Sequence, residues 1–299
     1  MACSRKKDMK VGFIGTGLMG LPMAQRLLDA QIEVIAYNRT PAKLEPLNIA
    51  GCAIAEQPYQ AIADSDCIIL MLTNAAAITS VLLSDIAKQH LSGKTVIQMS
   101  TIAPSESQEI AKEVVAAGGD YLEAPVLGSI PEAQAGKLIV MVGGSQAQFD
   151  KWQDLLKNFG SEPLLIGAVG SASAIKLALN QLIASLSTAF GLSLGFVQRQ
   201  GADVELFMQI LRQSALYAPT FDKKLQRMLD GDYANPNFPT KHLLKDADLF
   251  ISEAKTAELN VSSIEGVKKI LEIATNSGFG DSDYSSLFSA IAKQQSIDY

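Results

Sequence analysis

A glycine-rich turn between an apolar run and a helical pattern is the feature that most constrains how this chain folds. The stretch "VGFIGTGLMG" places Gly15, Gly17 and Gly20 in the spacing G-x-G-x-x-G. An apolar run typical of a buried strand precedes it, and a helical pattern follows. In that context the motif indicates a dinucleotide-binding turn: the first glycine permits the bend, the second lets the backbone approach a pyrophosphate, and the third lets helix and strand pack closely.

The N-terminus of the helix that follows the turn is expected to attract an anion. The free N–H groups and the positive end of the helix dipole meet at its first residues. Pro22 lies early enough in this helix to cost little. The residues expected to hold the pyrophosphate are Gly15, Thr16, Gly17, Leu18, Met19 and Gly20.

The end of the second expected strand, 33–37, predicts which nicotinamide cofactor binds. In such folds an acidic residue there binds the free ribose hydroxyls of NAD, whereas a basic residue accommodates the 2′-phosphate of NADP. The sequence has Asn38, Arg39 and Thr40 and no carboxylate. Because a guanidinium suits phosphate by its paired donors, we expect NADP (NADPH). The alternative is that Arg39 stacks on adenine and the site accepts either cofactor.

Short apolar runs alternate with helical patterns through the first half of the chain. The runs 67–72 and 95–99 are apolar at nearly every position, which is typical of strands buried on both faces of a parallel sheet. Residues 105–119 show one of the intervening helical patterns, and later strands are expected at 120–126 and 137–144. This alternation predicts a doubly wound α/β domain.

The character of the chain changes after about residue 167, where strand patterns end. A long helix is expected first, apolar on most of its circumference, and therefore buried all round between domains or subunits. We predict two domains, 1–168 for the cofactor and 169–299, all helical, for substrate and oligomerisation. Further helices are expected at 203–213, 220–229, 240–258, 262–276 and 284–293.

Composition excludes several classes of protein. The chain has 299 residues, of which 48% are hydrophobic and 19% charged, with a net charge of −6. No extended basic stripe is present, so nucleic acid is not expected as a partner. Cys3, Cys52 and Cys67 are too few for a disulfide framework or a zinc site, and we expect no metal. Reduced thiols and the lack of a signal-peptide pattern favour a cytoplasmic location.

One lysine stands out in the long helix. Lys176 is the single charged residue between Glu162 and Arg199. Burying an unpaired charge is costly, so the lysine either reaches water or faces a cavity where its charge is used. The stretch 177–198 has no charge and is long enough to span a membrane. Polar side chains within it favour a buried helix instead, among them Asn180, Gln181, Ser185, Ser187, Thr188 and Ser193.

Several motifs in order along the chain resemble one known family. They are "FIGTGLMGLPMA", "YNRT", "QMST" (98–101), "EAPVLGS" (123–129), "GSASAIKLALN" (170–180), "FPTKHLLKDADL" (238–249) and "GDSDYSSL" (280–287). With these the chain resembles the β-hydroxyacid dehydrogenases, and among them the glyoxylate/succinic semialdehyde reductases. The resemblance covers nearly the whole chain. It implies a Rossmann domain, a long interdomain helix, an all-helical C-terminal domain, and a homodimer or homotetramer.

The resemblance also assigns roles to residues. Lys176 matches the catalytic lysine and Asn180 its partner asparagine. Thr101 matches a position near the nicotinamide ribose and the substrate. The other matches are Phe238 and Asp246 in the substrate pocket, Lys245 at the cofactor, and Leu72 and Thr73 as backbone contacts to the cofactor.

One position departs from the family pattern. The family usually has serine after A-P-V, where it holds the substrate carboxylate, and this chain has Leu127. We expect Ser129 and the N–H of Gly128 to take over this role. The departure bears on the substrate more than on the type of reaction.

The expected reaction interconverts a small aldehyde or keto acid and its hydroxy acid. Lys176 and Asn180 are four residues apart and share one helix face, with the lysine expected to face a cleft between the domains. There Lys176 can hydrogen-bond the carbonyl oxygen and donate the proton as general acid, while Asn180 orients the lysine or the hydroxyl. Glyoxylate and succinic semialdehyde are the first expected substrates.

Three alternatives stay open. The first is a dehydrogenase of the 3-hydroxyisobutyrate, 3-hydroxybutyrate or tartronate semialdehyde type. The second is an imine reductase, against which Lys176 argues because such enzymes typically lack a lysine there. The third is a non-catalytic NADP-binding module, which would be expected to lose this lysine.

His242, beside Lys241, is expected to be solvated.

Overall fold

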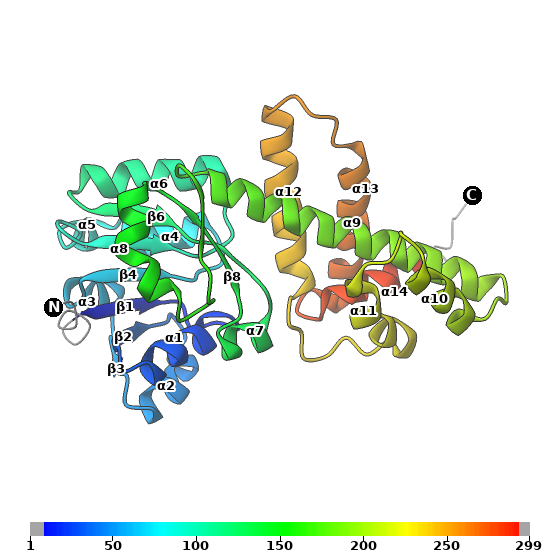
Figure 1. The fold of residues 1–299 in the computed structure, drawn as a ribbon, viewed down its shortest axis with the longest axis horizontal. Coiled ribbons are helices and arrows are strands. Elements are labelled where there is room, and N and C mark those ends of the chain that lie inside the picture. Colours follow the sequence, from blue (N-terminus) through cyan, green and yellow to red (C-terminus); the bar gives the residue numbers. More distant parts are fainter. Residues whose placement is uncertain (1–8, 293–299) are drawn as a thin grey trace. The chain divides into compact units, whose positions relative to one another are not determined.

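The computed structural model describes residues 9–292, in two compact units that meet within one long helix (Figure 1). The first unit ends at Lys176 and the second begins at Leu177. Cys3 and the last residue of the helix expected at 284–293 lie outside the described residues.

A single sheet forms the centre of the first unit. Its strand order is β3-β2-β1-β4-β5-β6-β8-β7, with β9 beside β8. The neighbours from β3 to β6 pair in parallel, whereas β8 runs antiparallel to β6. The strands are β1 (Lys10–Ile14), β2 (Glu33–Tyr37), β3 (Ala53–Ile54), β4 (Cys67–Leu70), β5 (Thr95–Gln98), β6 (Asp120–Glu123), β7 (Val126–Leu127), β8 (Ile139–Gly143) and β9 (Leu164–Gly167).

The order of the strands determines where a ligand can bind. Strand β1 has β2 on one side and β4 on the other. The chain runs outward from β1 through β2 to β3, and then returns to form β4 on the opposite side of β1. The crevice beyond the carboxyl end of such a strand is the usual ligand site of an open α/β sheet. The glycine-rich turn follows β1 at this point.

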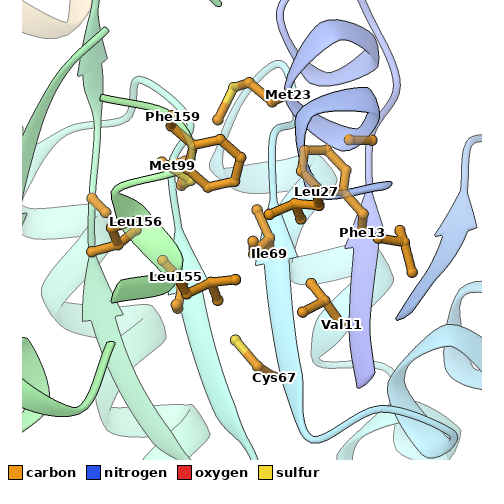
Figure 2. Close-up of a cluster of buried hydrophobic side chains, with 14 of the residues drawn as sticks. Val11, Phe13, Met23, Leu27, Cys67, Ile69, Met99, Leu155, Leu156 and Phe159 are labelled. Carbon is orange, nitrogen blue, oxygen red and sulfur yellow. The ribbon is translucent and has the colours of Figure 1, made fainter. Parts of the chain in front are cut away.

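Alternate side chains of each strand enter cores on the two faces of the sheet. Val11 and Phe13 of β1 pack on one face with α1 and α8, whereas Ile14 packs on the other. Figure 2 shows the first of these clusters, in which Met23 and Leu27 of α1 lie among the strand side chains. The helices of this unit are α1 (Gly20–Asp29), η1 (Pro41–Leu44), α2 (Glu45–Ile49), α3 (Pro58–Ala63), α4 (Ala75–Leu82), α5 (Asp85–Lys88), α6 (Pro104–Ala116), α7 (Ile130–Ala135) and α8 (Gln146–Leu156).

The second unit contains helices only, within the described residues. They enclose one apolar core, to which α9 contributes Phe190 and Leu194. A Rossmann-type domain followed by an all-helical part confirms the predicted fold class. The elements are α9 (Ser171–Arg199), α10 (Val204–Gln213), α11 (Pro219–Asp230), α12 (Thr240–Thr256), α13 (Ser262–Ala274), η2 (Thr275–Phe279), η3 (Tyr284–Ser286) and α14 (Leu287–Ala292).

Helix α9 contains the boundary between the two units and carries exposed apolar side chains. The two units divide inside it at Lys176, eight residues later than the predicted boundary at 168, because its first turn packs with the sheet unit. Within one chain it is not buried all round, since Leu192 is 63% and Phe196 64% exposed, and the expected burial between subunits stays a prediction. Among residues 9–292 it is the one helix long and apolar enough to cross a membrane, and 44% of its most apolar window is buried.

Candidate active site

The glycine-rich turn has room for a pyrophosphate. Gly15 has a φ of 102°, and a side chain there would clash with the backbone oxygen of Met71. A side chain on Gly20 would clash with the backbone oxygen of Gly15, as expected for close packing of helix on strand. Nothing lies within 4 Å of a Cβ built on Gly17, so the backbone is open to a ligand there. The turn therefore fits the cofactor that the motif predicts.

The N-terminus of α1 is presented to this opening. The helix begins at Gly20, and its N-cap residue Met19 makes no side-chain cap hydrogen bond. The N–H of Leu21 donates to the backbone oxygen of Gly17 at 3.0 Å and Pro22 has no N–H, so the donors left for an anion are the backbone N–H groups just before Leu21. Thr16 is buried and its N–H donates to Oδ1 of Asn38 at 3.2 Å. Asn38 thus holds the turn against the end of β2.

Two exposed cations lie where the adenosine ribose is expected. Arg39 follows Asn38 directly, and Lys43 lies on η1. The backbone oxygen of Lys43 accepts a hydrogen bond from Oγ1 of Thr16, which places this segment beside the turn. Within residues 9–292 neither cation forms an ion pair. The sequence analysis did not predict Lys43 as a contact to the cofactor. A second basic residue four positions after Arg39 could have indicated it.

A pair of buried polar side chains ties together the loops after β4 and β5. The N–H of Leu72 donates to Oγ of Ser100 at 2.7 Å, so this N–H is not available to a ligand. Gln98 donates to the backbone oxygen of Ser100 at 3.0 Å and accepts from its N–H. These bonds fix the loop positions of the predicted cofactor contacts Leu72, Thr73 and Thr101. Leu72 and Thr101 are half-buried, and Thr73 is exposed.

Ser129 and the N–H of Gly128 are the donors expected to bind the substrate carboxylate in place of the family serine, and only one of them is available. Ser129 caps α7, and both its N–H and its hydroxyl donate to Oε2 of Glu132, at 2.8 and 2.5 Å. A substrate carboxylate would meet the negative charge of Glu132 there. Gly128 is exposed with a φ of 138°, and its N–H has no bonding partner among the described residues. Of the two expected donors, Gly128 is the one that remains.

The lysine and its partner lie on one buried face of α9. Lys176 is 9% exposed and Asn180 is 2% exposed. Nδ2 of Asn180 donates to Oδ2 of Asp246 at 2.6 Å, which fixes the orientation of the amide. Within the described residues, Oδ1 of Asn180 has no hydrogen-bond partner. This leaves a buried acceptor on the helix face that Lys176 shares.

Helix α12 and the segment just before it carry the remaining predicted residues. Asp246 is buried, and its Oδ1 lies 2.8 Å from Nζ of Lys245. Asp246 therefore positions Asn180 and Lys245 in this structure. Its neighbour His242 is half-buried rather than solvated. Burial first, and then the charge of Lys245, hold the pKa of His242 below its ordinary value. Phe238 packs edge-on to Tyr284, with ring centroids 5.9 Å apart.

Comparison with known proteins decides the family. Residues 10–170 match the family described as the NAD binding domain of 6-phosphogluconate dehydrogenase. Residues 170–291 match the one described as NAD-binding of NADP-dependent 3-hydroxyisobutyrate dehydrogenase. The chain is 30% identical to glyoxylate/succinic semialdehyde reductase 1 of Arabidopsis thaliana, over 95% of this chain and 98% of the relative. The chain belongs to the β-hydroxyacid dehydrogenase family.

Two further relatives agree with this membership. The 2-hydroxy-3-oxopropionate reductase of Escherichia coli K12 is 32% identical over 95% of this chain and 97% of its own length. The crystal structure of a 3-hydroxyisobutyrate dehydrogenase from Salmonella typhimurium matches with a TM-score of 0.84 at 26% identity, over 94% and 99% of the two chains. As a β-hydroxyacid dehydrogenase, the protein is an NAD(P)-dependent oxidoreductase acting on CH–OH groups. The predicted family and enzyme class are confirmed.

No cluster of three or more metal-binding side chains occurs in residues 9–292.

Proposed function

We propose that this β-hydroxyacid dehydrogenase is an NADPH-dependent reductase of a small aldehyde or keto acid, with Lys176 as general acid in reduction and general base in oxidation. The observation that carries the proposal is the burial of Lys176 on the same face of α9 as Asn180. A buried ammonium is costly to keep, and a proton donor at a reacting carbonyl is a use that justifies it.

The residues of α9 supply the proton chemistry. When bound, NADPH supplies the hydride that adds to the carbonyl carbon. As negative charge gathers on the carbonyl oxygen, the ammonium of Lys176 donates a hydrogen bond to it and then the proton. Asn180 is held by Asp246 through its Nδ2, so its Oδ1 is presented as an acceptor for the hydroxyl that forms.

The preference for NADPH rests on the end of β2. Arg39 and Lys43 are exposed cations beside the turn, and no carboxylate lies between them. Charged hydrogen bonds to the 2′-phosphate favour NADPH by roughly 1.5–3 kcal/mol for each good contact.

The substrate class follows from the relatives and from the loop after β7. The names of the Arabidopsis and Escherichia coli relatives favour glyoxylate, succinic semialdehyde and 2-hydroxy-3-oxopropionate (tartronate semialdehyde) as substrates. In this chain Leu127 offers no hydroxyl, and the donors of Ser129 are used by Glu132. We therefore propose that the substrate carboxylate is bound weakly at this loop, through the N–H of Gly128.

The exposed apolar side chains of α9 and α10 favour a homodimer or a larger assembly. The free thiols of Cys52 and Cys67 favour a reducing compartment such as the cytoplasm. Leu192, Phe196 and Phe207 line an apolar groove on these helices. Ile210 of α10 is 70% exposed beside it. A monomer would leave this surface in water, and a second copy of the chain is the partner that we propose covers it.

A panel of carbonyl acids assayed with NADPH and with NADH tests the proposal. We expect turnover of glyoxylate, succinic semialdehyde or tartronate semialdehyde, with NADPH preferred. Reduction of cyclic imines and not of carbonyl acids would instead support an imine reductase. Binding of NADPH without turnover of any member of the panel would support the non-catalytic module.

A further inference from the structure

A buried carboxylate lies at the junction of the sheet and the long helix. Glu123 ends β6 and is fully buried. Its Oε1 accepts the backbone N–H groups of Gly170, Ala172 and Ser173 at 2.8, 2.9 and 3.1 Å. Its Oε2 accepts the hydroxyls of Ser173 at 2.7 Å and Ser107 at 2.5 Å. All five contacts come from donors, the pattern that an ionised carboxylate satisfies.

This carboxylate does the work that a local cap does in most helices. The first N–H groups of a helix are usually satisfied by a Ser, Thr, Asp or Asn at its own N-cap. In α9 they are satisfied by a residue of a strand, 47 to 50 positions earlier in the chain. A negative charge at a helix N-terminus is also favourable toward the helix dipole. Glu123 therefore joins the sheet directly to the start of α9.

Two glycines shape the backbone beside the carboxylate. Gly143 is paired with Glu123 in the register of β6 and β8, and a side chain there would overlap the carboxylate of Glu123. Gly170 has a φ of 101°, and a Cβ there would lie 2.6 Å from Nε2 of Gln108. Gly143 thus leaves room for the carboxylate, and Gly170 allows the left-handed backbone conformation at the point where its N–H donates to Glu123.

We propose that Glu123 is a positioning residue for the general acid Lys176, an inference that rests on the proposed function. Lys176 follows Ser173 by three residues, so it lies about 4.5 Å further along the helix axis. Because Glu123 fixes the N–H groups of the first turn of α9, it also fixes how far Lys176 lies from the end of the sheet and which way the helix turns its side chain. A displacement of about 1 Å at a reacting group can cost about a hundredfold in rate.

Two substitutions at Glu123 distinguish the effect of moving its acceptor oxygens from the effect of losing its charge. Glu123→Asp keeps the charge but retracts the carboxylate by one methylene, so it reaches the three N–H groups only if α9 moves. Glu123→Gln keeps the length, with its oxygen toward the N–H groups and its amide nitrogen toward the two hydroxyls. We expect Glu123→Asp to lower kcat at least about tenfold, with KM for NADPH within about threefold, and Glu123→Gln to restore most of the rate.

A matched pair of serines gives a milder comparison. Ser173→Ala removes a donor to Oε2 that comes from α9, whereas Ser107→Ala removes a donor to the same oxygen that comes from α6. We expect kcat to fall about threefold or more in Ser173→Ala and to change less than about twofold in Ser107→Ala. If Glu123→Asp does not fold, this pair decides the matter, and equal kcat values for the two variants would overturn the proposal.

A double-mutant cycle shows whether Glu123 acts through the lysine. In a Lys176→Ala background the Glu123→Asp change should add less than about twofold to the loss in kcat, because there is no longer a general acid to misplace. The same tenfold loss in both backgrounds, or a folded Glu123→Asp protein at the parent rate, would overturn the inference. A parent rate in Lys176→Ala alone would instead refute the proposed function.

Discussion

Removing the amine of Lys176 is the sharpest test of the proposed chemistry. General acid catalysis typically contributes about 10²–10⁴ in rate, and at 1.36 kcal/mol for each factor of ten this is about 2.7–5.4 kcal/mol of transition-state stabilisation. Lys176 is 9% exposed, so bulk water does not replace its ammonium readily. We therefore expect Lys176→Ala to lower kcat at least about a hundredfold, with the affinity for NADPH within a few-fold of the parent.

The assay follows NADPH oxidation at 340 nm under saturating substrate, with NADPH affinity measured separately by fluorescence. Lys176→Arg should fail as well, because a guanidinium does not release a proton near neutral pH. Lys157→Ala is the matched control, since Lys157 is an exposed lysine at the end of α8 that pairs with Asp154. A folded Lys176→Ala protein that binds NADPH and reduces its substrate at close to the parent rate would refute the reasoning.

Further predictions concern the cofactor, the substrate, stability and assembly. Arg39→Ala should raise KM for NADPH about ten- to a hundredfold and leave KM for NADH nearly unchanged; equal effects in steady-state kinetics would argue against a 2′-phosphate site. Leu127→Ser should lower KM for the acid substrate, whereas an unchanged or higher KM would show that Leu127 is not at the carboxylate. Lys224→Met should cost about 3–5 kcal/mol in the free energy of unfolding by denaturant, because both oxygens of buried Asp283 accept from Lys224 at 2.8 Å; a cost below about 1 kcal/mol would contradict this. Light scattering at micromolar concentration should give a dimer or larger, and a monomer would contradict the proposed interface.

Local sequence predicted the elements whose pattern is strong. The strands β1 and β2 lie where the apolar runs predicted them, and α9 follows the change of pattern after residue 167. These elements are readable because side chains alternate with a period of two in a strand and about 3.6 in a helix. The strands β3 and β9 were not predicted. Two residues carry too little pattern to identify β3.

The side-chain contacts that shape the candidate site were harder to predict from the sequence. The sequence predicted that Ser129 is a donor for the substrate, but its hydroxyl is already used by Glu132 one helical turn away. It did not predict the bond between Ser100 and Leu72, which joins two loops 28 residues apart. Such bonds depend on which strand ends become neighbours, and strand order is not written in any local pattern.

The sequence by itself determined the cofactor-binding turn, the division into a sheet part and a helical part, and the isolated lysine. Each of these depends on residue types at fixed short spacings, which local geometry converts directly into structure. Tertiary structure decided that Glu123 caps α9 and that Asp246 orients Asn180, across 47 to 66 positions of chain. The physical reason is that a buried polar group must find its partner wherever the fold brings donors and acceptors together, so the pairing appears only once the chain has folded.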